Sequence, residues 1–299
     1  MDAVRDAQSE TVIFTGADGQ RLEGTTFGAG GRPVLLLHGA GQTRHSWTRA
    51  AEALAASGFR ATTLDQRGHG DSAWVDDGAY AFEDFGRDAG AVLDALAQAS
   101  GMKPIVVGAS LGGIAGLLAE YVSAGTRLGA LVLVDVTPSL AMAGLLRIKA
   151  FMSEHIETGF ASLEEAAAAV ARYQPGRARS ASLDGLSRNL RPRADGRLRW
   201  HWDPALIEGS RNVMSGGDAV PAELRAAAAA LTVPTLLVRG GASDLVTETE
   251  AAEFRRLVPG AGYVDIADAG HMVAGERNDV FAAAIIDFLE GLPPVTRTR

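Results

Sequence analysis

One ten-residue segment, residues 104–113, restricts the fold of this chain more than any other. It begins with the apolar run Pro-Ile-Val-Val, continues with Gly-Ala-Ser-Leu-Gly centred on Ser110, and leads into a helix-forming stretch. The two glycines of the pentapeptide fit a tight strand-to-helix turn, because a side chain at either position would clash with the neighbouring strand or helix. We therefore predict a buried strand, a sharp turn with Ser110 at its apex, and a helix over residues 111–122.

The same order of strand and helix recurs along most of the chain. Residues 33–37 form a continuous apolar run typical of a strand buried on both faces, and residues 82–99 carry an apolar stripe at helical spacing. This alternation predicts an α/β fold, with a mostly parallel, eight-stranded sheet flanked by helices. Strands are predicted at residues 11–14, 21–27, 33–37, 59–64, 105–107, 130–134, 233–238 and 262–266, and helices at residues 47–56, 82–99, 111–122, 221–231, 247–257 and 279–292.

The alternation breaks after Thr137-Pro138. Between residues 139 and 217 there is no long apolar strand, and helix-like pieces at residues 141–151 and 162–173 are joined by polar or Arg-rich loops. We interpret residues 1–138 and 218–299 as one core. Residues 139–217 are then a mainly helical lid, inserted after the sixth strand and lying over the carboxyl edge of the sheet.

Composition narrows the class of protein. A chain of 299 residues that is 47% apolar fits one large domain, or one domain with an insertion. The net charge of −8 argues against nucleic acid or an anionic membrane as a partner. No apolar run approaches the roughly 20 residues that span a bilayer, and the first ten residues lack the apolar core of a signal peptide. With no cysteine, a disulfide or a cysteine nucleophile is excluded. We expect a cytoplasmic protein, monomeric or homo-oligomeric.

Ser110 needs a partner to act as a nucleophile. A serine hydroxyl is weak at neutral pH and is activated by a base, typically a histidine that a carboxylate orients. Parallel strands bring their carboxyl ends to one edge of a sheet, so the partners should follow other strands. His271 follows the strand at residues 262–266 on a Gly-containing loop and is the predicted base. The glycines that follow His38 favour a structural or oxyanion-loop role for it, and His69, in a Gly-rich turn, is interpreted as structural.

Two carboxylates compete to orient His271. Asp244 lies just past the strand at residues 233–238, and Asp135 ends the strand at residues 130–134. A third, Asp268, is interpreted as a solvated loop carboxylate.

Taken together, these motifs resemble those of the α/β-hydrolase superfamily, in which the turn at Ser110 is the nucleophile elbow. Asp244 lies just past the strand that precedes the histidine strand, and the order Ser110, Asp244, His271 matches that of nucleophile, acid and base in the superfamily. The resemblance therefore favours Asp244, with Asp135 as the second candidate. The resemblance also implies an oxyanion hole made by the N–H groups of Leu111 and Ala40, with Gly41 as a fallback donor. The matching segments are His38-Gly-Ala-Gly41, Asp65-Gln-Arg-Gly-His-Gly-Asp-Ser72, Gly108-Ala-Ser-Leu-Gly-Gly113, Gly241-Ala-Ser-Asp244 and Gly270-His271.

Four residues are candidates for contact with substrate. Trp200 and Trp202 alternate around His201, so an extended chain places both tryptophans on one face. They form either an aromatic wall over the pocket or a fastening between lid and core. Trp47 follows the predicted oxyanion loop and is the fourth candidate.

The resemblance implies hydrolysis of an ester, lactone, amide or C–C bond through an acyl-enzyme, with no metal and no cofactor. We predict a carboxylesterase-like serine hydrolase whose partner is a small, largely apolar ester or lactone. A C–C bond hydrolase and a cofactor-free perhydrolase would use the same residues, and a small-ligand receptor of this fold is the alternative without catalysis. Epoxide hydrolases and haloalkane dehalogenases of this fold carry aspartate at the nucleophile position, so Ser110 argues against both.

Overall fold

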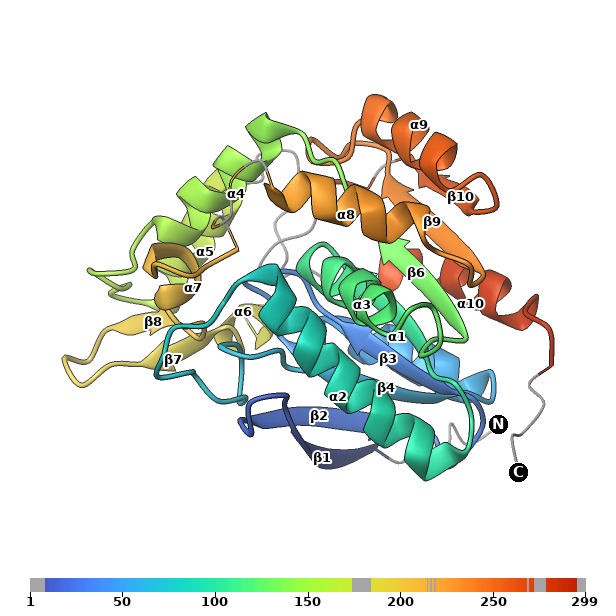
Figure 1. The fold of residues 1–299 in the computed structure, drawn as a ribbon. Helices are drawn as coiled ribbons and strands as arrows, with labels where there is room; N and C mark the ends of the chain where they lie inside the picture. The colour runs from blue at the N-terminus through green and yellow to red at the C-terminus, as the bar shows by residue number, and fades with distance from the viewer. Residues whose placement is uncertain are drawn as a thin grey trace, which may run out of the picture.

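The computed structural model describes residues 9–173, 184–213, 215, 217, 219–267, 269–271 and 278–294. Within these residues eight strands form one sheet, in the order β1-β2-β4-β3-β5-β6-β9-β10 (Figure 1). Only the pairs β1–β2 and β2–β4 are antiparallel, so the predicted mostly parallel sheet is confirmed. The strands are β1 (Ser9–Thr15), β2 (Arg21–Phe27), β3 (Pro33–Leu37), β4 (Arg60–Leu64), β5 (Ile105–Ala109), β6 (Ala130–Val134), β9 (Thr235–Gly240) and β10 (Gly262–Ile266).

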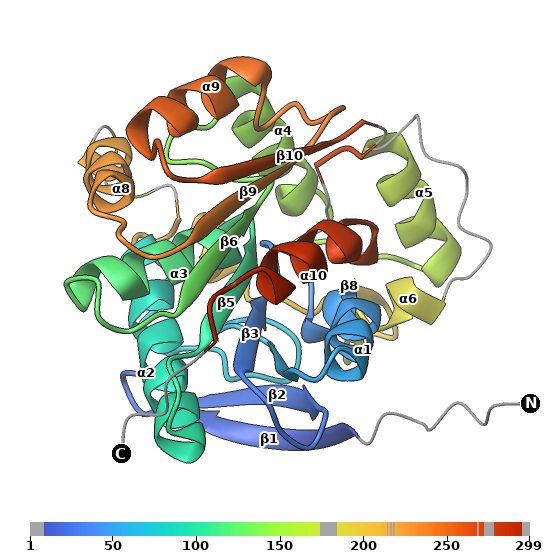
Figure 2. The same cartoon turned by 90° about the vertical axis from the view of Figure 1, so that its right-hand side faces the viewer.

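Helices cover both faces of this sheet (Figure 2). Alternate residues of a buried strand pack on opposite faces: Val34 and Leu36 contact the cluster of α1 and α10, whereas Leu35 and Leu37 contact the cluster of α2, α3, α8 and α9. Burial on both sides explains why the central strands read as continuous apolar runs. The helices are α1 (Thr48–Ala56), α2 (Phe82–Ser100), α3 (Leu111–Val122), α8 (Ala219–Ala229), α9 (Glu248–Leu257) and α10 (Ala282–Glu290), with 3₁₀ turns η1 (Arg44–Trp47) and η2 (Asn278–Phe281) preceding α1 and α10.

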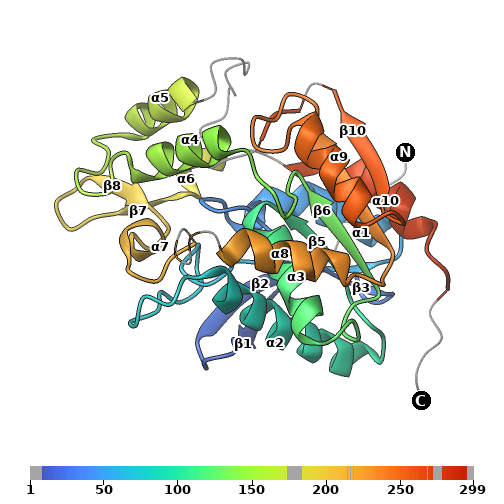
Figure 3. The same cartoon turned by 45° about the horizontal axis from the view of Figure 1, so that its top comes forward.

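Residues 139–217, hereafter the insertion, separate β6 from α8 and β9. Figure 3 shows their helices gathered together beyond one end of the main sheet. Hydrogen bonds join the insertion to the loops that follow β3, β4 and β9, which places it at the carboxyl edge. Its small hairpin, β7–β8, was not predicted, because strands of three residues leave no periodic signal. Its elements are α4 (Met142–Ser153), α5 (Leu163–Tyr173), α6 (Asp184–Ser187), β7 (Leu190–Pro192), β8 (Leu198–Trp200) and α7 (Ala205–Glu208).

None of the helices in the described ranges is both long and apolar enough to cross a bilayer.

Candidate active site

Ser110 forms the apex of the turn between β5 and α3. Its backbone has φ 48° and ψ −116°, a conformation that is strained for any residue with a Cβ. The flanking glycines are required sterically, as predicted. A Cβ at Gly108 would lie 2.4 Å from the backbone of Gly112, and a Cβ at Gly112 would lie 2.4 Å from the Leu37 carbonyl oxygen. The sequence therefore holds the serine on a sharp turn at the carboxyl edge of the sheet.

Asp135 lies beside this turn on the neighbouring strand. Ala109 of β5 pairs with Val134 of β6, so Ser110 and Asp135 are the next residues on two parallel strands that end level. The Ser110 N–H donates to the Val134 carbonyl at 3.1 Å, which ties the two strand ends together. Asp135 also has a positive φ, 51°, so both strands end in a strained residue.

The Asp135 carboxylate is buried and surrounded by donors. Its Oδ1 accepts the Gly240 N–H at 3.0 Å, and its Oδ2 accepts the Ser243 hydroxyl at 2.7 Å. The Nδ1 of His271 is also 2.7 Å from Oδ2. A buried carboxylate is tolerated where such hydrogen bonds replace water. Asp135 is therefore the carboxylate that orients His271.

His271 lies on the loop after β10 and is 9% exposed. An ionised carboxylate can only accept, so Nδ1 carries the proton in this pair and a neutral ring leaves Nε2 as the basic nitrogen. The loop is held in place because the Ala242 N–H donates to the Ala269 carbonyl at 2.9 Å. Among the described residues Nε2 has no hydrogen bond, and none joins His271 to Ser110. The role of Ser110 and His271 as a reacting pair stays a prediction.

The preference for Asp244 as the orienting acid is wrong. Asp244 pairs with Arg147 of α4 at 2.9 Å, and its side chain is 37% exposed. The next residue of this loop also contacts the insertion, because the Leu245 carbonyl accepts the Ala141 N–H at 3.0 Å. The residue of this loop that faces the site is Ser243, which adds a donor to Asp135. Asp268 lies outside the described residues.

The loop after β3, residues 38–43 and hereafter the β3 loop, passes beside Ser110. A Cβ at Gly39 would lie 3.4 Å from the Ser110 Cβ. The Gly39 N–H donates to the Gln42 side chain, and the Gly41 N–H donates to His69 Nε2 at 3.2 Å. The Gly41 N–H already has an acceptor in His69, so it does not fit the role of fallback donor to the oxyanion hole.

Two amides near Ser110 remain unused in the described part of the chain. The structure gives the Ala40 N–H no acceptor there. Leu111 is the first residue of α3, so its N–H has no acceptor within the helix. Both donors are the ones that the sequence predicts for an oxyanion hole, and that assignment stays a prediction.

Three buried histidines, namely His38 of the β3 loop together with His69 and His201, contact the backbone of that loop and form what we call the histidine cluster. The ring centroids of His38 and His69 are 4.9 Å apart, and those of His69 and His201 are 5.8 Å apart. Burial lowers the pKa of His38 to about 4 and, with the neighbouring His38, the pKa of His69 to about 3. Burial likewise lowers the pKa of His201 well below its ordinary value. The rings are neutral near pH 7.

Each cluster ring uses its basic nitrogen to accept a backbone N–H. Gln66 donates to His38 Nε2 at 3.1 Å, and Gly70 donates to His201 Nδ1 at 2.7 Å. With the Gly41 amide on His69 Nε2, the cluster has no spare lone pair for a metal ion. The structural role predicted for His38 and His69 is therefore confirmed.

The predicted substrate contacts have different outcomes. The expectation for Trp47 is wrong: the ring is fully buried in the core with α1, on the opposite face of the sheet from α3. Trp200 and Trp202 share a face, as predicted, and stack at 4.7 Å with their planes 13° apart. A Cβ at Gly41 would lie 3.3 Å from the Trp202 ring, so this stack fastens the insertion to the β3 loop. Contact of Trp200, His201 and Trp202 with substrate stays a prediction.

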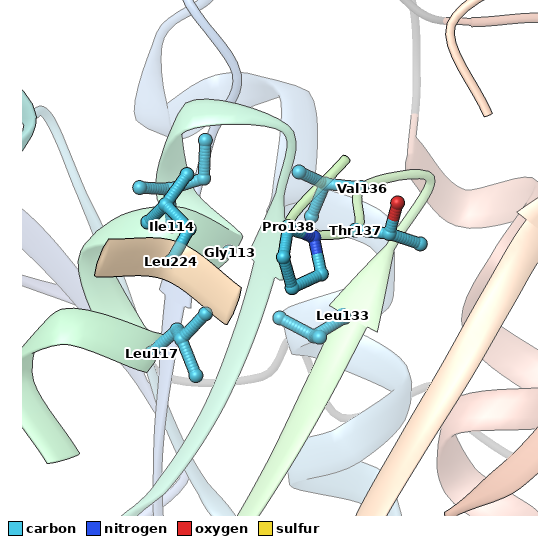
Figure 4. A pocket seen from close by; sticks show the side chains of 8 residues that line it. All are labelled: Gly113, Ile114, Leu117, Leu133, Val136, Thr137, Pro138 and Leu224. Carbon is cyan, nitrogen blue, oxygen red and sulfur yellow. The ribbon is translucent and has the colours of Figure 1, made fainter. Parts of the chain in front are cut away.

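A small apolar pocket lies behind the turn at Ser110, between α3, the end of β6 and α8 (Figure 4). Val136 and Pro138, which follow Asp135, face Ile114 of α3 and Leu224 of α8 there. Thr137 is the one polar side chain among the described residues that line the pocket, and it donates its hydroxyl to the Ser139 carbonyl. None of these described lining residues is titratable, and the pocket packs the segment after Asp135 against α3.

Comparison with known proteins identifies the family. A model of the alpha/beta hydrolase family matches residues 34–284. The chain is 31% identical to the esterase Rv0045c of Mycobacterium tuberculosis over 268 residues, which cover 87% of this chain and 82% of that protein. It is 28% identical to a 3-hydroxybutyrate-oligomer hydrolase of Cupriavidus necator over 253 residues, 80% of this chain and 82% of the relative.

Solved structures show the same fold. An alpha/beta hydrolase from Novosphingobium aromaticivorans matches with a TM-score of 0.76 at 26% identity, covering 95% of this chain and 99% of that one. The family match spans the turn at Ser110, Asp135 and His271. The chain therefore belongs to the α/β-hydrolase family, and it is a hydrolase.

Proposed function

We propose that this hydrolase cleaves a carboxylic ester or lactone through an acyl-enzyme on Ser110. The observation that carries the proposal is the 2.7 Å hydrogen bond from His271 to Asp135, beside the strained turn that presents Ser110. A buried histidine held by a carboxylate, at the same sheet edge as a serine at a helix N-terminus, supports activation of that hydroxyl for attack on a carbonyl.

The reaction follows from the roles of these groups. The Ser110 Oγ attacks the carbonyl carbon while His271 Nε2 takes the hydroxyl proton, and Asp135 stabilises the resulting imidazolium. The N–H groups of Leu111 and Ala40 hold the oxyanion of the tetrahedral intermediate. Collapse of that intermediate breaks the bond to the alkoxide, which leaves with the proton from His271. Water then attacks the acyl-enzyme by the same steps, releasing the acid and restoring Ser110.

The substrate class rests on two lines of support. Relatives that match most of the chain are named as an esterase and as a 3-hydroxybutyrate-oligomer hydrolase. The buried aromatic and aliphatic side chains next to the β3 loop, Trp202 and Met152, suit a small and largely apolar acyl group. We also propose that the insertion acts as a lid, since it lies at the sheet edge that carries Ser110.

A variant of the nucleophile tests this proposal. Ser110→Ala should lower the turnover of short-chain p-nitrophenyl esters and lactones by about 10⁴-fold or more, since it removes the attacking atom. Ser57→Ala is the matched control, because Ser57 is an exposed residue at the end of α1. Equal turnover by Ser110→Ala and the wild-type protein would contradict the proposal.

The same assay separates the alternative activities. A vinylogous diketone tests for C–C hydrolysis, and peroxide with a carboxylic acid tests for perhydrolysis. Preference for either over esters would replace the ester and lactone assignment, although Ser110 would keep its role. Saturable binding of an ester with no turnover would instead indicate a receptor and would contradict catalysis altogether.

A further inference from the structure

We propose that His201, a residue of the insertion, is a positioning residue for the oxyanion hole. The inference rests on the proposed function, because it concerns the donor that Ala40 supplies to the reaction. It assigns to the insertion a part in forming the catalytic geometry, in addition to covering it.

The histidine cluster holds three consecutive peptide groups of the β3 loop. His38 Nδ1 lies 2.9 Å from the Gly39 carbonyl oxygen and holds the peptide between residues 39 and 40. His69 Nε2 accepts the Gly41 N–H at 3.2 Å and holds the peptide between residues 40 and 41. His201 Nε2 lies 3.4 Å from the Gly41 carbonyl oxygen and holds the peptide between residues 41 and 42. The loop is thus fixed one peptide plane at a time.

This arrangement determines where the Ala40 N–H points. The Ala40 N–H and the Gly39 carbonyl belong to the same planar trans peptide, so they point in opposite directions. The Gly39 carbonyl accepts from His38 and from the Gln42 N–H at 3.1 Å. The Ala40 N–H is therefore turned away from the cluster. The peptide that His201 holds, between residues 41 and 42, is separated from this one by the peptide between residues 40 and 41, so a displacement at the His201 contact would reach Ala40 through a single intervening peptide.

His201 is the member of the cluster that bridges two loops from outside the core. Its Nδ1 accepts the Gly70 N–H at 2.7 Å, so the neutral ring carries its proton on Nε2 and donates it to the Gly41 carbonyl. Gly41 has φ 78°, and a Cβ added to it would lie 3.3 Å from the Trp202 ring. The insertion therefore contacts the loop residue next to Ala40 through two adjacent side chains.

The test compares His201→Asn with His201→Gln. Asparagine places an acceptor near the position of Nδ1 and keeps the bond from Gly70, but it is too short to reach the Gly41 carbonyl. Glutamine places a donor near the position of Nε2. We expect His201→Asn to lower kcat for a p-nitrophenyl ester by about 10- to 100-fold, less than the loss of a whole donor, with KM changed less than threefold. We expect His201→Gln to recover most of that loss.

Inhibition by an alkyl boronic acid distinguishes positioning of the oxyanion hole from mere attachment of the insertion, because attachment alone would leave the Ki of the boronic acid unchanged. The boronic acid forms a tetrahedral adduct with the nucleophile and places an oxygen in the oxyanion hole, so its Ki in His201→Asn should rise by the same factor as kcat falls. The Ki of the product carboxylic acid should not change. Tyr80→Phe is the matched control: it removes the 2.6 Å bond from Tyr80 to Asp203 of the insertion and the 3.0 Å bond that Tyr80 accepts from the Val75 N–H, and neither bond involves the β3 loop. In Tyr80→Phe, the ratio of the Ki of the boronic acid to the Ki of the carboxylic acid should stay within twofold of the wild-type ratio.

Hydrogen exchange of the peptide covering the β3 loop adds a readout that is independent of activity. Exchange should rise about tenfold in His201→Asn and stay unchanged in Tyr80→Phe. An unchanged boronate Ki and unchanged exchange in both His201 variants, with active wild-type protein, would overturn the inference. Failure of the proposed function looks different, because the wild-type protein itself would then neither turn over esters nor bind the boronate.

Discussion

The ends of β6 and β9 are neighbours in the sheet and each is followed by an aspartate, yet the two carboxylates have different surroundings. Asp135 comes directly after the last residue of β6, is 3% exposed and contacts three donors. Asp244 comes four residues after β9, is partly exposed and pairs with Arg147 of the insertion. Strand register brings Asp135 level with Ser110, whereas Asp244 lies farther along its loop, beside the insertion. The loop after β9 contributes Ser243 to the site and gives Asp244 to the insertion.

Substitution at the end of β6 should have the largest effect. Asp135→Asn keeps the shape of the side chain but presents an N–H to Nδ1, which favours the wrong tautomer of His271. We expect kcat for a p-nitrophenyl ester to fall by about 10³- to 10⁴-fold. Steady-state kinetics at pH 8 measure this loss. A loss below tenfold would mean that the hydrogen bond between Asp135 and His271 is not used in turnover.

The buried histidine cluster should destabilise the folded protein at acid pH, so the two aspartate variants are best compared near neutral pH. Burial holds the pKa of His38 at about 4, below the ordinary value of 6.5. The unfolded chain therefore binds a proton that the folded chain does not, and the free energy of unfolding should fall as pH drops from 6.5 to 4. The loss is on the order of 3 kcal/mol for this group. Denaturant unfolding across that range measures it.

His69→Gln is the control for that titration, because glutamine can accept the Gly41 N–H but does not titrate. The pKa of His69 is held at about 3, so the variant should lose the contribution of His69 to the pH dependence of the free energy of unfolding. The slope of unfolding free energy against pH should decrease by about 1.4 kcal/mol per unit between pH 6 and 4. An unchanged slope would show that His69 does not remain neutral in the folded protein.

Ser243→Ala sharpens the comparison at the end of β9. The change removes one of three donors to Asp135, and with it the oxygen that accepts the Leu245 and Val246 N–H groups at 3.2 Å each. The loss of one hydrogen bond to a charged group corresponds to about 1.5 to 3 kcal/mol, so kcat should fall by roughly 10- to 100-fold. A full wild-type kcat would show that the other two donors suffice to hold the carboxylate.

Asp244→Asn should have the smallest effect. The ion pair with Arg147 is half exposed, and such pairs contribute about 0 to 1 kcal/mol. We expect kcat within about threefold of the wild-type value and a small decrease in thermal midpoint. Calorimetry and the same ester assay check both numbers. A loss as large as that of Asp135→Asn would reverse the assignment of the two aspartates.

Much of the core could be predicted because burial on both faces leaves a clear pattern. The bounds predicted for β3, α3, β6 and β10 agree with the structure residue for residue. Glycines around Ser110 predicted the turn for a steric reason that the structure confirms. The position of His271 at the sheet edge followed from the same pattern of strands.

The orienting acid could not be predicted, because chain order is satisfied by Asp135 and by Asp244 alike. What separates them is register: Ala109 and Val134 pair across β5 and β6, which brings Asp135 level with Ser110. Register depends on strand pairing over long separations and leaves no local signal. The same holds for His201, which contacts Gly70 from 131 residues away in the sequence.

The rate at which a fluorophosphonate labels the protein measures whether Asp135, acting through His271, activates Ser110. The reagent reacts with an activated serine without needing a particular substrate, and mass spectrometry of digested protein locates the adduct. We expect an adduct on Ser110, formed at similar rates in wild type and Asp244→Asn and about 10³-fold more slowly in Asp135→Asn. An adduct on another residue, or equal rates in wild type and Asp135→Asn, would contradict these roles of Ser110 and Asp135.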